Sequence, residues 1–442
     1  MKIDCLVAEI GSTTTVVNAF NIFNEVKYLG KGISQTTVET DVLEGLLEAI
    51  ENLKANLEIK DLSYDHFYAS SSAAGGLTIT VHGLVYEMTA KAAKEAALNA
   101  GGNIKLITAN LLDDLTISEV RNINPNLIIV SGGTNYGEKD VAYNNLLNLM
   151  SLNIPIIYTG NIENHNRIKK LNNKNIFIVE NVYPKVDYFN IMPLREKIYE
   201  TFEKHIIHAK GMGHIFDLVK DNIIPTPGAV MDLTMLLNEL YDGVLTIDVG
   251  GATTDVHSIS EPKEEYKKYL EGEPKEKRTV EGDLGVYINR MQVKDFLKLD
   301  KKYNLTNNEL EEILKNEPYI PKSEIYKAIQ KDLIKACINE SLNRHIGDLK
   351  QVYTTNGLKV IPEGKDLTNV KSIFLTGGAL INDIDSGDYI RTYLKNQTTK
   401  LSPSSNTKIF IDKDYIFASL GVLSRYHKKE AIELIKTHIK EV

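Results

Sequence analysis

Apolar and polar positions along the first hundred residues follow the two-residue period of strands and then the longer period of a helix. The runs "CLVAEIG", "TTTVVNAFNI" and "VKYLGKGIS" read as three strands, the stretch at 41–57 as a helix, and "HFYASSS" as a further strand. Two strands around a Gly-Ser-Thr turn, followed by alternating strands and helices, predict an α/β layer with a hairpin on one edge.

Four short β-branched runs between residues 102 and 182 alternate with helical stretches. They are "NIKLITAN", "NLIIVSGG", "IPIIYTGN" and "IFIVENV". This alternation is typical of a parallel sheet with crossover helices. We therefore expect a self-contained α/β subdomain at 102–185, inserted between a first lobe at 1–101 and a second lobe at 186–442.

The hairpin pattern of the opening returns in the second half as "DGVLTIDVGGATTDVHSIS". Asp248 stands where Glu9 stands in the first hairpin. The charged stretch at 261–281 predicts a solvated excursion, and helices dominate 290–347. A buried strand then breaks into the glycine turn of "SIFLTGGALIN", and an amphipathic helix closes the chain.

Composition narrows the functional classes. The 442-residue chain has a formal net charge of −8, which argues against non-specific nucleic-acid binding because that requires clustered Lys and Arg. The N-terminus is too charged for a signal peptide, and no apolar stretch approaches a membrane span. Cys5 and Cys337 predict neither a disulfide framework nor a zinc or redox site. We expect two buried thiols and a cytoplasmic location.

The two glycine turns predict a site for a polyphosphate. A phosphate needs hydrogen-bond donors at close approach, and a tight turn without intervening Cβ atoms aims several backbone N–H groups at one point. Two such turns facing each other would clamp a polyphosphate from both sides. The candidate residues are Gly11, Ser12, Thr13 and Thr14 in the first turn, and Gly250, Gly251, Ala252, Thr253 and Thr254 in the second.

The carboxylate two residues before each leading glycine predicts a magnesium site. Mg²⁺ keeps several of its waters and takes one or two carboxylates together with phosphates. We therefore expect Glu9 and Asp248 to hold the water shell of Mg²⁺. A single "EIGSTTT" would equally fit a plain hairpin whose glycine only permits the turn, and the second copy favours the functional interpretation.

A third glycine turn, "TGGAL" at 376–380, ends a buried strand. Gly377 and Gly378 are candidates to border an adenine ring or ribose. The order of hairpin, hairpin, glycine turn and terminal helix is much more specific than any one of these parts.

These motifs resemble those of the superfamily that holds actin, sugar kinases and heat-shock chaperone ATPases. "VAEIGSTTTVV" resembles its first phosphate loop, "TIDVGGATTDVHSI" its second, "FLTGGAL" its adenosine motif and "ASLGVL" its closing helix. The resemblance implies an actin-like ATPase fold of two lobes, each with a ribonuclease-H-like mixed sheet, and ATP with Mg²⁺ as cofactors. Glu9 departs from the usual Asp, so its metal role is less firmly implied than that of Asp248.

Over nearly the whole chain, including "ASSSAAGGL", "SGGTNYG" and "RTVEGDLG", the sequence resembles the glutamate mutase accessory protein L family, also called MutL or GlmL. This family shares only a name with the mismatch-repair protein. The resemblance implies an ATPase that reactivates adenosylcobalamin-dependent glutamate mutase by promoting exchange of damaged cobalamin. The mutase subunits are the implied partners, and the sequence gives no oligomeric state.

Several further motifs have both a functional and a structural interpretation. The loop "SGGTNYGEKD" at 131–140 is either an anion or partner site or a structural turn, the turn being favoured. Asp255 would polarise water or fix its own hairpin, and Glu281 or Asp283 would order the attacking water or form a surface charge pair. The string "DVHSIS" is similar to a cobalamin-binding D-x-H-x-x-G, but it lies inside the hairpin, so we do not expect His257 to ligate cobalt.

Three other functions remain open at this point. A small-molecule kinase of the same fold needs a carboxylate base, for which Asp255 and Asp283 are the candidates. An activator of radical dehydratases would hold an iron–sulfur cluster through two cysteines per subunit, but Cys5 lies inside a predicted strand. A scaffold that binds no nucleotide is disfavoured by the paired acid–glycine turns.

Overall fold

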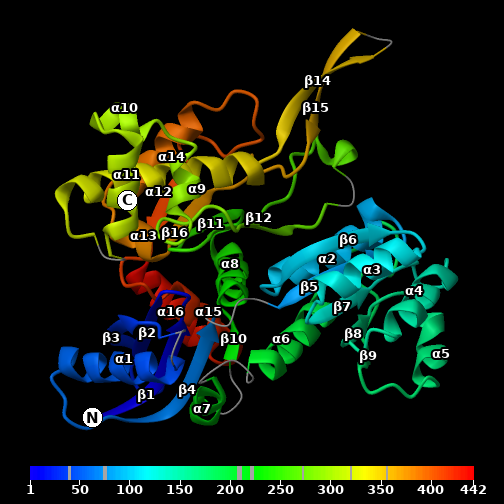
Figure 1. The fold of residues 1–442 in the computed structure, drawn as a ribbon, viewed down its shortest axis with the longest axis horizontal. Coiled ribbons are helices and arrows are strands. Elements are labelled where there is room, and N and C mark those ends of the chain that lie inside the picture. Colours follow the sequence, from blue (N-terminus) through cyan, green and yellow to red (C-terminus); the bar gives the residue numbers. More distant parts are fainter. Residues whose placement is uncertain are drawn as a thin grey trace. The chain divides into compact units, whose positions relative to one another are not determined.

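The chain forms two compact units in a computed structural model (Figure 1). Unit 1 comprises Met1–Ala73, Ala229–Leu270 and Lys275–Val442, and unit 2 comprises Ala74–Gly228 and Glu271–Pro274. Part of the motif "ASSSAAGGL", residues 73–76, lies outside the described residues. The structure describes residues 1–37, 41–72, 77–206, 212–219, 223–270, 273–318, 321–354 and 357–442.

The first sheet of unit 1 grows from the opening hairpin. Within the unit its order is β4-β1-β2-β3, and β1 pairs antiparallel with β2 and parallel with β4. This register places Glu9 opposite Val16 of β2 and Ser70 of β4. Helix α1 begins where the Asp41 side chain accepts a hydrogen bond from Leu43 N, and it packs on β2 and β3. The bounds are β1 Lys2–Ile10, β2 Thr14–Asn21, β3 Lys27–Gln35, β4 Ser63–Ser71 and α1 Val42–Asn56.

The second sheet of unit 1 has the order β13-β12-β11-β16-β17-β18. β11 pairs antiparallel with β12 and parallel with β16, so Asp248 lies opposite Asp255 and Thr376. The charged stretch at 261–281 was expected to be a solvated excursion, which is wrong for its last part. That part forms β13, where Lys277 and Arg278 are buried. The bounds are β11 Val244–Val249, β12 Thr254–Ile259, β13 Glu276–Glu281, β16 Ser372–Thr376, β17 Lys408–Ile411 and β18 Lys440–Glu441.

The two sheets share one plan. In each, the first strand pairs antiparallel with the second, the second antiparallel with the third, and a later strand joins the first strand in parallel on its other side. This is the ribonuclease-H-like mixed sheet, present twice. The predicted actin-like fold with an inserted α/β subdomain is confirmed.

Helices cover the second sheet and end the chain. Helix α12 contributes buried side chains such as Leu333 and Ile338 to the main apolar core. Helix α15 packs closely on α8, because a Cβ on Gly421 would lie 1.9 Å from the Ala229 carbonyl oxygen. An antiparallel ribbon of β14 and β15 carries exposed apolar residues such as Tyr353. The bounds are α8 Thr226–Tyr241, η3 Lys267–Tyr269, α9 Arg290–Lys294, α10 Leu299–Tyr303, α11 Asn307–Asn316, α12 Glu324–His345, β14 Asp348–Thr354, β15 Gly357–Glu363, α13 Gly378–Ile381, α14 Ser386–Lys395, α15 Phe417–Tyr426 and α16 Lys428–His438.

Unit 2 is built on a parallel sheet of order β6-β5-β7-β8-β9. Its core includes Ile128, Val130, Leu146 and Tyr158. The insertion expected at 102–185 lies inside this unit, which also contains β5 and α2 before it and α6 and α7 after it. The bounds are β5 Thr78–Gly83, η1 Tyr86–Ala90, α2 Lys91–Asn99, β6 Asn103–Ala109, α3 Asp114–Ile123, β7 Leu127–Val130, α4 Asp140–Met150, β8 Ile156–Tyr158, η2 Ile162–Asn164, α5 His165–Lys169, β9 Ile176–Ile178, α6 Met192–Ile206, α7 Met212–Val219 and β10 Ile223–Pro225.

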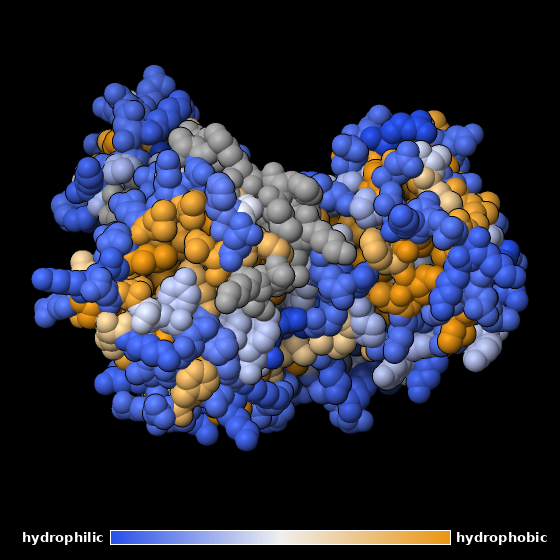
Figure 2. Space-filling model, turned by 90° about the horizontal axis from the view of Figure 1, so that it is seen from below, coloured by the Kyte–Doolittle hydropathy of each residue, from blue (hydrophilic) through white to orange (hydrophobic). Residues whose placement is uncertain are grey.

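The surface is mixed in character. Figure 2 shows one face, on which hydrophilic residues surround patches of apolar ones. Of the helices in the described part of the chain, none combines the length and the apolar character needed to cross a bilayer.

Candidate functional site

The two glycine turns of unit 1 have the same local geometry. The Gly11 amide donates to the Thr14 carbonyl at 2.9 Å, and the Gly250 amide donates to the Thr253 carbonyl at 2.9 Å. In the first turn the Thr14 hydroxyl is buried without a hydrogen-bond partner, which is costly unless a ligand supplies one. The sequence-level match between the hairpins therefore extends to their backbone bonding.

The segment at 282–289, which follows β13, packs against the second turn. Gly251 O accepts hydrogen bonds from Tyr287 N at 2.9 Å and Ile288 N at 2.8 Å. Asn289 Nδ2 donates to the Ala252 carbonyl at 2.6 Å, and a Cβ on Gly285 would lie 2.3 Å from that same oxygen. The end of the motif "EGDLG" and the residues that follow it thus lie against the second turn and hold its backbone in place.

Glu9 ends the first strand as a buried carboxyl group. The pKa of Glu9 is raised to about 8, first by burial and then by the charges of Asp248 and Asp412, against the lowering effect of a hydrogen bond from the Tyr415 hydroxyl. The Tyr415 oxygen lies 3.4 Å from Glu9 Oε1. Because an uncompensated buried charge is costly, a cation near this carboxylate would be stabilising.

Asp248 occupies the corresponding place at the end of β11. Burial of its carboxyl group raises the pKa of Asp248 to about 7, and the charges of Asp255 and Asp412 act in the same direction. The third glycine turn lies directly beside it, because a Cβ on Gly377 would lie 2.4 Å from Asp248 Oδ1. Gly377 has φ +96°, a conformation that favours glycine, and Gly378 begins α13. The structure thus brings Asp248 and the predicted adenosine turn together.

Asp412, a fully buried carboxylate just after β17, was missed by the sequence analysis. Its two oxygens accept hydrogen bonds from Ile416 N and Phe417 N, each at 2.9 Å, and from the Thr376 hydroxyl at 3.0 Å. Burial raises the pKa of Asp412 to about 6, although these three hydrogen bonds lower it. Two of these donors lie four and five residues further along the same segment, and only Thr376 comes from another strand.

The other acidic candidates are paired with arginines. Asp255 Oδ1 lies 2.7 Å from Arg278 Nη2, and both side chains are buried. Because Arg278 lies on β13, this contact ties β12 to the neighbouring strand, which is a structural role rather than the polarising of water. Arg344 binds Asp283 through two nitrogens at 2.7 and 2.9 Å. Arg344 Nη1 also lies 2.6 Å from Glu281 Oε2, so these two acids form the charge cluster that was the alternative to ordering water.

The donor set of the site suits a hydrated magnesium ion. Within the described ranges, no group of three His, Cys, Asp or Glu side chains is arranged to hold a metal ion directly. The charges of Asp248 and Asp412 nevertheless raise the pKa of Glu9, and the charge of Asp412 raises the pKa of Asp248. Mg²⁺ retains several waters and binds through few carboxylates, and it fits such a set better than a metal that requires a closed protein shell.

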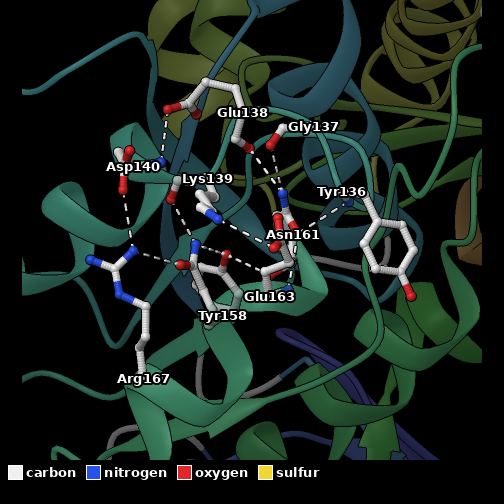
Figure 3. Close-up of polar contacts among 10 residues, drawn as sticks. Tyr136, Gly137, Glu138, Lys139, Asp140, Tyr158, Asn161, Glu163 and Arg167 are labelled. Atoms are coloured by element: carbon white, nitrogen blue, oxygen red, sulfur yellow. Dashed lines mark hydrogen bonds and ion pairs between the residues drawn. The ribbon is translucent and has the colours of Figure 1, made fainter.

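The loop "SGGTNYGEKD" of unit 2 is held by hydrogen bonds among its own residues and with Asn161 (Figure 3). Glu138 Oε1 accepts hydrogen bonds from Asp140 N at 2.7 Å and Val141 N at 3.0 Å, so the protein's own carboxylate caps α4. Asn161 Nδ2 donates to the Gly137 carbonyl at 3.0 Å, and Asn161 Oδ1 accepts from Tyr136 N at 3.3 Å. The N-terminus of α4 is therefore occupied, which disfavours the anion site considered for this loop.

The cysteines and His257 lie in regular secondary structure. Cys5 in β1 and Cys337 in α12 are free and fully buried, and burial raises the pKa of both thiols. The expected burial of both thiols is confirmed. A fully buried Cys5 cannot reach a subunit face to ligate an iron–sulfur cluster. His257 is fully buried in β12, inside the second hairpin.

Comparison with known proteins identifies the family. The family described as "MutL protein" matches residues 5–439. "Protein MutL" from Clostridium tetanomorphum is 33% identical over 460 residues, covering 99% of each chain. Among solved structures, the nucleotide-free diol dehydratase-reactivating factor has 10% identity and a TM-score of 0.40, covering 97% of this chain and 100% of that one. The nucleotide-free acetone carboxylase has 12% identity and a TM-score of 0.41, covering 96% of this chain and 70% of that one. The chain therefore belongs to the MutL protein family.

Proposed function

We propose that this protein is a magnesium-dependent ATPase that reactivates an adenosylcobalamin-dependent mutase, glutamate mutase being the expected client. The observation that carries the ATPase proposal is the pair of acid–glycine hairpins with matching backbone bonding in two sheets of one plan. The mutase proposal rests on membership of the MutL family together with the resemblance to glutamate mutase accessory proteins.

In this proposal each turn grips the phosphates through its backbone and hydroxyl groups. Gly11, Ser12, Thr13 and Thr14 act on one side of the polyphosphate, and Gly250, Gly251, Ala252, Thr253 and Thr254 act on the other. The buried Thr14 hydroxyl supports this role, because a phosphate oxygen would supply its missing partner. Gly377 and Gly378 border the adenosine.

Glu9 and Asp248 hold the water shell of Mg²⁺, which supplies the positive charge that stabilises the phosphoryl group during transfer. Both carboxyl groups must be ionised to do so, and their raised pKa values mean that the cation and the carboxylates stabilise one another. Asp255, proposed from the sequence as a second catalytic residue, acts on Asp248 through the Arg278 pair that fixes the hairpin.

Hydrolysis is coupled to client release in this proposal. Closed lobes hold the γ-phosphate and open when it is lost, so the two arrangements differ in their contacts with the nucleotide. This movement of the lobes exposes the mutase cofactor and permits exchange of damaged cobalamin. The cytoplasm, where the client works, is the proposed location.

A small-molecule kinase is the alternative. It would need a carboxylate base directed at a substrate hydroxyl, and both candidates, Asp255 and Asp283, are instead bound to arginines. Phosphate transfer to an added metabolite, rather than to water, would favour the kinase.

The test is recovery of glutamate mutase inactivated with hydroxocobalamin, after addition of this protein, fresh coenzyme and either Mg-ATP or a non-hydrolysable analogue. We expect recovery with ATP alone. Asp248→Asn should lower ATP hydrolysis about 100-fold or more, by analogy with the loss of one charge-stabilising group, and should abolish recovery.

The matched control is Asp242→Asn, because Asp242 lies just before the same strand with an 87% exposed side chain. It should leave hydrolysis and recovery at wild-type levels. Undiminished hydrolysis by Asp248→Asn would contradict the site, whereas normal hydrolysis without recovery of the mutase would contradict the client.

A further inference from the structure

The turn at 412–416 joins the second sheet of unit 1 to α15. Asp412 follows β17 and is anchored to the end of β16 by the Thr376 hydroxyl. The same carboxylate accepts hydrogen bonds from Ile416 N and Phe417 N and so caps the start of α15. Because Thr376 lies opposite Asp248 in the sheet, Asp248, Thr376 and Asp412 form a row across three neighbouring strand ends.

The opposite side of this turn is bound to the first sheet of unit 1. Asn18 of β2 is fully buried, and its Nδ2 donates to the Tyr415 carbonyl at 3.2 Å and to the Ser419 hydroxyl at 2.9 Å. Lys31 of β3 donates to the Asp414 carbonyl at 2.9 Å. The Tyr415 hydroxyl reaches Glu9 Oε1 at 3.4 Å. The turn thus contacts the end of the first strand and the ends of the second sheet at once.

The backbone of Tyr415 has φ +56°, in the left-handed region. A bulky aromatic residue rarely adopts this conformation, and it persists only where surrounding contacts determine it. Here the Asn18 bond to the carbonyl and the Tyr415 N bond to the Asp412 carbonyl at 3.2 Å hold it. The conformation directs the ring toward Glu9.

We propose that residues 412–416 form a coupling turn, in which Tyr415 positions the Glu9 carboxylate and Asp412 ties that position to the end of β16 and the start of α15. Tyr415 and Asp412 are positioning residues, and neither is assigned a contact with the nucleotide. The proposal rests on the proposed nucleotide site, because it assigns Glu9 to the cation.

The chemistry of the contact explains why positioning matters. A glutamate side chain has one more rotatable bond than aspartate and loses more freedom when it is fixed. A hydroxyl donor on Oε1 restrains the carboxylate and leaves Oε2 to accept hydrogen bonds from the water shell of a cation. The departure from Asp to Glu at position 9 is thus matched by a phenol that restrains the longer side chain.

The test compares ATP affinity with and without Mg²⁺ by calorimetry in the wild type and in Tyr415→Phe. This substitution keeps the ring and removes only the donor. We expect the Mg²⁺-dependent gain in ATP affinity to fall about threefold, as for loss of one long hydrogen bond. ATP affinity in EDTA should be unchanged. Tyr353→Phe is the control, because Tyr353 is 87% exposed on β14.

A second measurement follows the coupling itself. Amide hydrogen exchange at Ile416 and Phe417, the donors to Asp412, should slow when Mg-ATP binds to the wild type. We expect this protection to be reduced in Tyr415→Phe and in Thr376→Val, which removes the hydroxyl bond to Asp412. Equal protection in the wild type and both variants would overturn the coupling turn.

The two proposals fail differently. If wild-type protein shows no Mg²⁺-dependent gain in ATP affinity, the proposed nucleotide site is wrong. If the wild type shows the gain and Tyr415→Phe retains it in full, the nucleotide site stands and the coupling turn is wrong.

Discussion

At the scale of single residues, the ends of three strands are the most unusual part of the molecule. Glu9, Asp248 and Asp412 are buried acids, and their negative charge is offset by Arg278 near Asp248, by Lys31 near Asp412 and by hydrogen-bond donors. Such an arrangement is costly for folding and is expected where a cation binds. These acids therefore lower the stability of the folded chain at the place where the proposed cation would bind.

Gly377 allows a residue-scale prediction. Gly377→Ala would force a side chain into the left-handed region and place its Cβ 2.4 Å from Asp248 Oδ1 and 2.5 Å from the Val249 carbonyl oxygen. We expect a loss of about 2–4 kcal/mol in the free energy of unfolding, measured by urea denaturation, and weaker ATP binding.

Gly282→Ala is the matched control, because a Cβ there would meet nothing within 4 Å. Its free energy of unfolding should stay within about 0.5 kcal/mol of the wild type. Equal stability of the two variants would show that the third glycine turn is not as closely packed as described.

At the scale of elements, buried polar contacts hold β12, β13 and α12 together. His345 of α12 lies between the Ser258 hydroxyl, 2.8 Å from Nε2, and the Thr279 hydroxyl, 2.9 Å from Nδ1. Burial holds the pKa of His345 well below its usual value, and the charges of Lys365 and Lys277 lower it further. The folded protein therefore keeps this imidazole neutral.

This contact predicts a loss of stability in acid. Below about pH 6.5 the unfolded chain protonates His345 and the folded chain does not, so the stabilisation is present above that pH and is lost as the pH falls. The expected slope is about 1.4 kcal/mol per pH unit. Urea unfolding at pH 7.5 and 5.5 should show a larger acid loss for the wild type than for His345→Gln. Equal losses of stability in the wild type and His345→Gln would contradict a neutral His345 in the folded protein.

The elements also show what the sequence could and could not predict. Both hairpins and the third glycine turn were predictable, because each carries a local signal: a β-branched strand ending in glycine. Asp412 was not, since its contact with Thr376 of β16 and its proximity to Asp248 arise only from the pairing of the strands. Strand β5 was also not among the strands predicted from the sequence. The charges of β13 suggested exposure, and their buried partners come from elsewhere in the chain.

At the scale of the whole molecule, the chain forms two compact units, and the proposed nucleotide residues all belong to unit 1. A ligand stabilises the cooperative folding unit to which it binds by RT ln(1 + [L]/Kd), and a unit that unfolds independently gains nothing. At one hundred times Kd this amounts to about 2.7 kcal/mol. The units should therefore respond unequally to nucleotide.

Amide hydrogen exchange tests this expectation. Mg-ATP at one hundred times Kd should slow amide exchange in β11 of unit 1 about 100-fold. The exchange rates of β7 in unit 2 should stay unchanged. The control is the same measurement on the wild type without nucleotide, in which neither strand should gain protection. If β7 and β11 gain equal protection, the two units unfold as one cooperative body.

The buried thiols described above have a practical consequence. Both native cysteines are buried with raised pKa values, and the chain contains no tryptophan. Alkylating reagents react with exposed thiolates, so a single cysteine introduced on an exposed position would accept a maleimide dye selectively. A single introduced tryptophan would likewise be the only indole emitter. Fluorescence from a dye or a tryptophan introduced at one position would therefore report conformational changes at that position alone.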